Sequence, residues 1–178
     1  MCIRDSYKCA SEQYYGAIVG RVCGRIKNAH FSIGEECYEL AANDIYGKPK
    51  FNHLHGGILG FHNRLWDSSI KENEQGEETV VFTCLSKDGE EGYPGNLSVS
   101  VSYTLTVDNS VEMVCRAVTD KVTPINVTNH AFFNLAGVRN NIDVLSHSLR
   151  LCSSQIIACD DNLVPTGDLV SVAGTVLD

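Results

Sequence analysis

The amino-acid sequence predicts an all-β protein built from antiparallel strands, and three observations support this fold class. Apolar and polar residues alternate over long stretches, as in a strand with one buried and one exposed face. No window of about a dozen residues carries apolar side chains at the helical spacing i, i+3, i+4, i+7. Turn residues recur every 8 to 12 residues or so, which is the spacing expected for an antiparallel sandwich or barrel.

The clearest element is a hairpin over residues 97–119. Odd positions from Leu97 to Leu105 are apolar, whereas the even positions are Ser or Thr. Asp108 and Asn109 supply turn residues, and apolar residues then alternate again from Val111 to Ala117. This alternation places Cys115 on the apolar face of its strand, so we expect it in the core.

Two further hairpins follow from the same reasoning. One has arms at residues 65–71 and 79–85 around a polar stretch, with Cys84 on the apolar face of the second arm. The other is shorter, covers residues 31–40 and turns at Gly34 and Glu35. No internal repeat or interdomain linker is visible, so the strands are expected to belong to one domain.

Composition excludes several classes of protein. The chain has 178 residues, of which 43% are hydrophobic and 20% charged, as in ordinary globular domains. Its 14 basic and 22 acidic side chains give a net charge of -8, which argues against binding to nucleic acid. No apolar run is long enough to span a membrane.

Cysteine usage and the first residues bear on the compartment. None of the eight cysteines forms a Cys-x-x-Cys pair of the zinc-site kind, and their number allows a disulfide framework. The apolar-face positions of Cys84 and Cys115 favour free thiols in a reducing environment instead. Arg4 and Asp5 stand where an export signal would need apolar residues. The expected location is therefore cytoplasmic.

Polar segments rich in Gly, Asn and His interrupt the alternation at residues 20–26, 52–57 and 128–135, and are candidates for a binding site. His130 has two interpretations: a core histidine bonded to the main chain, or a proton donor, because histidine titrates at about pH 6.5. Arg25 either binds a substrate hydroxyl or pairs with a surface acid.

His53, His55 and His62 invite a metal interpretation, because histidines two apart on a strand share one face. No carboxylate between Asn52 and His62 completes a ligand set, and two glycines directly after His55 favour a turn. We therefore expect no metal site.

Taken together, the polar segments resemble the aldose 1-epimerases, also called galactose mutarotases. The matching blocks are residues 20–26 (Gly-Arg-Val-x-x-Arg-Ile), 52–61 (Asn-x-Leu-His-Gly-Gly-x-x-Gly-Phe), 91–97 (Glu-Gly-Tyr-Pro-Gly-Asn-Leu) and 123–137 (Thr-Pro-x-Asn-x-Thr-Asn-His-x-x-Phe-Asn-Leu-Ala-Gly). The resemblance runs from about Tyr14 to Asp178, and the residues ahead of Tyr7 do not match it.

The resemblance implies an antiparallel β-sandwich with an open sugar cleft, no cofactor and no metal. The implied reaction interconverts the α and β anomers of a free hexose such as galactose or glucose. The implied general acid is His130, and His55 and Arg25 hydrogen-bond sugar hydroxyls. The implied substrate-binding positions further include Asn129, Phe132 and Gly24.

Three departures from the family pattern affect these expectations. Gly24 stands where the family commonly has Asn, and Phe132 where it often has Tyr. The family's general base, a glutamate, and its sugar-binding aspartate would lie beyond Asp178. We therefore expect residues 1–178 to be a partial domain that is inactive alone and exposes unpaired strand edges. The alternative function is a sugar-binding relative without turnover.

Overall fold

The computed structural model describes residues 14–46, 51–72, 76–137 and 143–178. These residues form strands and three short 3-10 turns, and every pairing between named strands is antiparallel, so the predicted all-β class is confirmed. No helix in this part of the chain has the length and apolar character needed to cross a membrane. The strands are β1 (Ile18–Val19), β2 (Arg25–Ile26), β3 (His30–Ile33), β4 (Glu36–Glu39), β5 (His53–Leu54), β6 (Asp67–Glu72), β7 (Glu78–Ser86), β8 (Leu97–Leu105), β9 (Val111–Thr119), β10 (Thr128–Asn129), β11 (Gln155–Cys159) and β12 (Pro165–Ser171), and the turns are η1 (Lys27–Ala29), η2 (Phe61–Asn63) and η3 (Glu90–Gly92).

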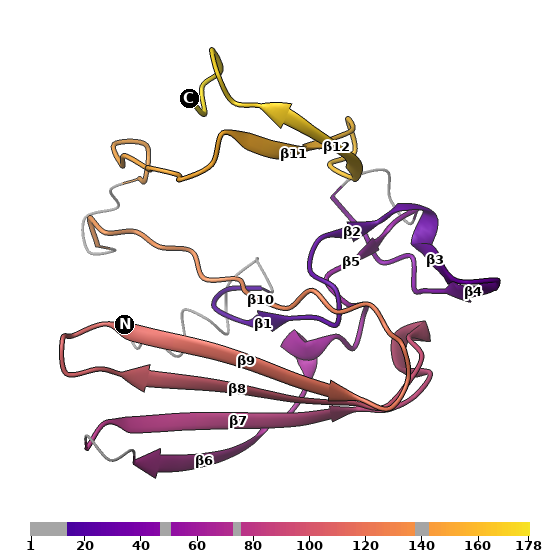
Figure 1. Cartoon of the computed structure of the whole chain (residues 1–178), viewed down its shortest axis with the longest axis horizontal. Coiled ribbons are helices and arrows are strands. Elements are labelled where there is room, and N and C mark those ends of the chain that lie inside the picture. Colours follow the sequence, from indigo (N-terminus) through magenta and orange to yellow (C-terminus); the bar gives the residue numbers. More distant parts are fainter. Residues whose placement is uncertain (1–13, 47–50, 73–75, 138–142) are drawn as a thin grey trace.

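A four-stranded sheet in the order β6-β7-β8-β9 is the largest element (Figure 1). It contains the predicted hairpins: β8 and β9 pair over their whole length, and β6 pairs with β7. The arm predicted from residue 65 begins two residues later, and Leu65 itself is 99% exposed. The third predicted hairpin is present as β3 and β4, with Gly34 at a φ of 61° in its turn.

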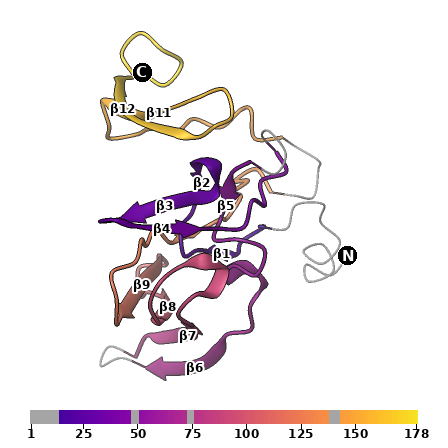
Figure 2. The same ribbon diagram turned by 90° about the vertical axis from the view of Figure 1, so that its right-hand side faces the viewer.

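The core lies on one face of this sheet. Leu97, Val99 and Val101 of β8 are fully buried and pack with Phe61 of η2. Partly buried residues of β1 and of the segment before β10 also belong to the cluster. Strand β1 lies over the sheet in both views (Figures 1 and 2), and β10 lies beside it in Figure 1. Each fully buried aliphatic side chain contributes roughly 1.5 to 3 kcal/mol of transfer free energy. The apolar residues that alternate along β8, as predicted, therefore hold the upper layer against the sheet.

The prediction that Cys84 and Cys115 occupy core positions is wrong for Cys115. Both lie on the buried face of the sheet, because Cys84 pairs with Val99 and Cys115 with Val101. Cys84 is half-buried, whereas Cys115 is exposed. Its strand β9 is at the edge of the sheet, and the layer over β8 stops short of it among the described residues. All six cysteines within the described ranges are free thiols.

Two-residue ladders position the segments above the core. Strand β1 pairs with β10, so that Ile18 lies opposite Asn129, and β2 pairs with β5, so that Arg25 lies opposite Leu54. The β11–β12 hairpin lies at the end of the molecule away from the four-stranded sheet in both views (Figures 1 and 2). The β1–β10 and β2–β5 ladders therefore carry three of the polar segments.

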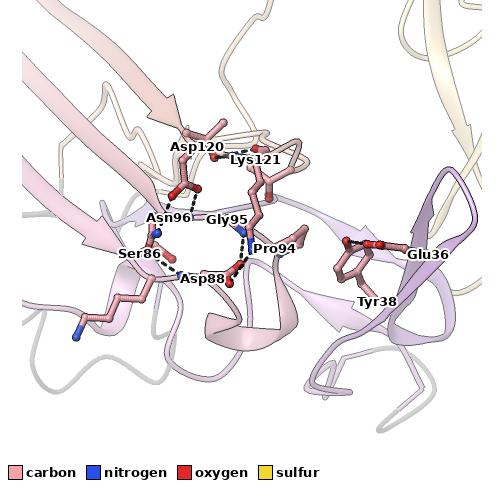
Figure 3. A network of polar contacts seen from close by, with 12 residues as sticks. Glu36, Tyr38, Ser86, Asp88, Pro94, Gly95, Asn96, Asp120 and Lys121 are labelled. Carbon is pink, nitrogen blue, oxygen red and sulfur yellow. Dashed lines mark hydrogen bonds and ion pairs between the residues drawn. The ribbon is translucent and has the colours of Figure 1, made fainter.

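The connection between β7 and β8 is held by a network of polar contacts (Figure 3). Asp88 accepts a hydrogen bond from Gly95 N at 2.5 Å and forms an ion pair with Lys121 at 2.9 Å. Asn96 donates to Asp120 through both its main-chain N and its Nδ2, each at 2.7 Å. This network fixes the loop that contains most of the motif block at residues 91–97.

Candidate active site

Gly24 and His55 are joined by two hydrogen bonds at the end of the β2–β5 ladder. His55 N donates to Gly24 O, and Gly24 N donates to Nδ1 of the His55 ring, both at 3.1 Å. Gly24 has a φ of 85°, a conformation that glycine adopts at no steric cost. The pairing brings two predicted site residues from separate motif blocks into direct contact.

The same bond defines the chemistry of the His55 ring. Because Nδ1 accepts a hydrogen bond, the proton of the neutral ring lies on Nε2. Burial, together with the nearby charges of His130 and Arg25, lowers the pKa of His55 to about 4. His55 is therefore neutral at pH 7 and offers a single donor, Nε2–H.

His130 lies beside His55, at the end of the β1–β10 ladder. The two ring centroids are 5.1 Å apart and the rings are perpendicular, at 89°. Its main chain is fixed because His130 N donates to Ala17 O at 2.8 Å. The ring is half-buried, and within the described residues neither of its nitrogens has a hydrogen-bond partner. His130 is therefore not a core histidine whose ring bonds to the main chain, which was one of the two interpretations of the sequence.

Arg25 pairs with a buried acid and not with a surface one. Its Nε donates to Asp44 Oδ2 at 2.7 Å, and Nη2 is 3.4 Å from Oδ1. Asp44 is fully buried, and the Arg25 side chain is 13% exposed. Nη1 of Arg25 has no hydrogen-bond partner within the portion of the chain that the structure describes, so it remains able to donate to a ligand.

Asn129 and Phe132 take different places near His130. The Asn129 side chain bonds within the protein: Nδ2 donates to Tyr103 OH, and Oδ1 accepts from Ala131 N, each at 2.8 Å. Phe132 is 59% exposed, with its ring centroid 4.9 Å from that of His130. Phe132 therefore forms an open aromatic wall, while Asn129 fixes the local backbone.

The three histidines of the metal hypothesis serve separate roles. His53 is fully buried between Ala41 O and Tyr93 OH, each 2.8 Å from one ring nitrogen. Both nitrogens are thus occupied, and burial lowers the pKa of His53. His62 contacts the ring of Tyr14. Among the residues described there is no group of three or more His, Cys, Asp or Glu side chains placed to hold a metal.

Arg21 connects two segments next to the site, and the sequence alone indicated no role for it. It is 2% exposed, and its five N–H groups make six hydrogen-bond contacts, two of them to the hydroxyls of Ser86 and Thr123 and four to carbonyl oxygens at residues 86, 87, 94 and 95. Burial lowers its pKa from the ordinary value, but an arginine stays protonated in proteins. Arg21 therefore joins the β1–β2 segment to the β7–β8 loop.

Two other residues that contact the site were not predicted. Tyr14 packs against His55, His62 and His130, and Asp44 holds Arg25. Neither lies in a motif block, and the segments that contain them show no periodic pattern. The only signal in the sequence was the residue type: one is a tyrosine and the other is an aspartate.

Comparison with known proteins is consistent with this arrangement. The family model described as aldose 1-epimerase matches residues 3–178, and the chain belongs to that family. The match begins at residue 3, so the prediction that the residues ahead of Tyr7 fall outside the family pattern is wrong for residues 3–6. The sandwich fold expected from the resemblance is confirmed by the solved structures of relatives.

Similar proteins span a wide range of organisms. The chain is 41% identical over 177 residues to an aldose 1-epimerase of Haemophilus influenzae, covering 99% of this chain and 49% of the relative. It is 40% identical to the galactose mutarotase of Bos taurus, covering 94% and 45%. The structure of galactose 1-epimerase from Lactobacillus acidophilus matches with a TM-score of 0.79 at 28% identity, covering 99% of this chain and 49% of that one. The chain thus spans about half the length of the relatives that it matches.

Proposed function

We propose that this chain carries the acid side of an aldose 1-epimerase site, which interconverts the α and β anomers of a free hexose such as galactose or glucose. The observation that supports this most directly is the pairing of His130 and His55, with the His130 ring nitrogens unengaged by described residues. Residues 1–178 would then belong to a larger domain. A cytoplasmic location remains a prediction.

In the proposed reaction, the imidazolium of His130 protonates the ring oxygen of the sugar while a base removes the proton of the anomeric hydroxyl. The ring opens, the aldehyde end rotates, and closure yields either anomer. The resemblance assigns the base to a glutamate that none of this chain's glutamates matches. The active protein would draw that base from sequence beyond Asp178.

The neutral state of His55 suits this role. Two charged imidazoles 5.1 Å apart would repel each other by about 3 kcal/mol at an effective dielectric constant of about 20. Because the pKa of His55 is lowered to about 4, the His55 ring places no positive charge beside His130 near pH 7. His55 Nε2–H and Arg25 Nη1 then donate to sugar hydroxyls and orient the ring oxygen toward the acid.

A second candidate function is sugar binding without turnover. It is favoured by Gly24, which lacks the amide that the resemblance leads us to expect, and by Phe132, which lacks a hydroxyl. A Cβ built at Gly24 meets no atom within 4 Å, so the space for an amide side chain is open. This candidate predicts galactose binding but no acceleration of anomer exchange.

The test is a chimera in which this chain replaces the matching half of the Haemophilus influenzae relative. Polarimetry of α-D-galactose should show turnover, and His130→Asn should slow it by about 10²-fold to 10⁴-fold, as expected for loss of a general acid. His30→Asn is the matched control, because His30 is exposed and, among the described residues, its ring hydrogen-bonds only to Asn28 O. An unchanged rate in His130→Asn would remove His130 from the mechanism, and binding without turnover would favour the second candidate.

A further inference from the structure

Tyr14 is a buried ring that contacts three histidines. It is 3% exposed, and its ring centroid lies 4.6 Å from that of His55, 4.7 Å from His62 and 5.6 Å from His130. The first two contacts are edge-on, whereas Tyr14 and His130 are stacked, with an interplanar angle of 26°. One aromatic ring is therefore the common wall of both imidazoles in the candidate site.

The segment that carries Tyr14 also holds the main chain of His130. Residues 14–17 form a turn closed by a hydrogen bond from Ala17 N to Tyr14 O at 3.0 Å. Gly16 N donates to His130 O at 3.1 Å, and His130 N donates to Ala17 O at 2.8 Å. The turn thus locates the backbone of the histidine, and its first side chain packs on the imidazole.

Packing must orient the His130 ring, because no described residue hydrogen-bonds its nitrogens. Of the rings that contact it, Phe132 is 59% exposed and His55 is half-buried, so Tyr14 is the most enclosed. We infer that Tyr14 is the positioning residue that fixes the orientation of the His130 imidazole and shields His55 from water. The consequence for catalysis rests on the proposed function, whereas the positioning itself does not.

Removing the ring should have two separate effects. Without the stacked face of Tyr14, the His130 side chain gains rotamer freedom and its nitrogens no longer hold one direction. Without the buried wall, water reaches His55, and the burial that lowers its pKa is relieved. Both effects are attributed to the aromatic ring, and Tyr14→Phe keeps that ring, so it should preserve the wild-type behaviour of the two histidines.

The experiment uses the 178-residue chain and follows the histidine ring protons by NMR as a function of pH. In the wild-type chain and in Tyr14→Phe, His55 should titrate at about pH 4. In Tyr14→Leu, its midpoint should rise by about one pH unit or more toward 6.5. The ring protons of His130 should also lose the ring-current shift caused by stacking. The charged groups facing His55 are the same in all three proteins: Arg25, Asp44, His62 and His130.

A control variant and a second NMR measurement also test the role of Tyr14. Phe31→Leu removes a ring that packs on Tyr38 and Tyr93, and it should move neither His55 nor His130. If Tyr14→Leu does not fold, nuclear Overhauser effects in the wild-type chain still decide. Their absence between the rings of Tyr14 and His130 would overturn the inference, as would an unchanged His55 midpoint in a folded Tyr14→Leu.

Titration with D-galactose of the chimera, without a substitution and with Tyr14→Phe or Tyr14→Leu, separates this inference from the proposed function. If galactose shifts the His130 signals of the unsubstituted chimera but does so less in Tyr14→Leu, both are supported. If galactose leaves the His130 signals unchanged in every protein while Tyr14→Leu still alters the histidine titration, the positioning role stands and the proposed function fails. A His130 shift on galactose addition that is equally large with and without Tyr14→Leu would contradict the positioning role.

Discussion

Replacing Arg21 with lysine should destabilise the fold strongly, although the charge is kept. The guanidinium makes six hydrogen-bond contacts through its five N–H groups, four of them to buried or half-buried carbonyls, whereas an ammonium group has three donors. At least two charge-assisted donors are therefore lost, each with a net value of about 1.5 to 3 kcal/mol. Because such values do not add fully, we expect a loss of about 3 to 5 kcal/mol in the free energy of unfolding.

Urea denaturation followed by the fluorescence of the single tryptophan, Trp66, measures this change, because that residue packs against the core. Arg116→Lys is the matched control on the exposed edge strand β9, and it should change the free energy of unfolding by no more than about 0.5 kcal/mol. A loss below about 1 kcal/mol for Arg21→Lys would show that the six bonds do not hold the β7–β8 loop in solution.

Two further predictions concern the turn at His55. The pKa of His55 is about 4 when folded and about 6.5 when unfolded, so between these values the unfolded chain binds a proton that the folded chain does not. Stability should therefore fall by about 2 kcal/mol more between pH 7 and pH 4 in the wild type than in His55→Gln, after allowance for partial exposure. Urea titrations at each pH would show no such difference if His55 were already solvated. Gly56→Ala should cost more than about 3 kcal/mol or prevent folding, because its Cβ would lie 1.7 Å from Gly20 O. Gly34→Ala, also at positive φ but facing open space, should cost about 1 kcal/mol, and equal losses would contradict the steric explanation.

Alternation predicted the long strands but not the short ones. Residues 97–105 reveal a strand because every second side chain meets the same layer. Strands β1 and β10 have two residues each and pair across more than a hundred positions, so no local pattern marks them. For the same reason the sequence showed which face Cys115 takes, but not that the edge strand β9 is left uncovered.

The sequence pointed to those residues of the candidate site that lie in the motif blocks. The structure brings Gly24, Arg25, His55, Phe132 and His130 into one region, as the matched blocks suggested. Asp44 and Tyr14 could not be foreseen, because each owes its place to a loop conformation and not to a spacing. Arg21 lay in a motif block, yet nothing in the sequence indicated that its partners would be carbonyl oxygens.

The contact between Gly24 N and the His55 ring has a consequence for the shape of the main chain. A second proton on the ring would have to reside on Nδ1, where it would point at the Gly24 amide hydrogen. Two hydrogens cannot share that space, so the strand end that carries Gly24 would have to retreat from its neighbour. Acid would then push the two backbone segments away from each other as well as charge a side chain, and the ladder end would loosen as the imidazole becomes a cation.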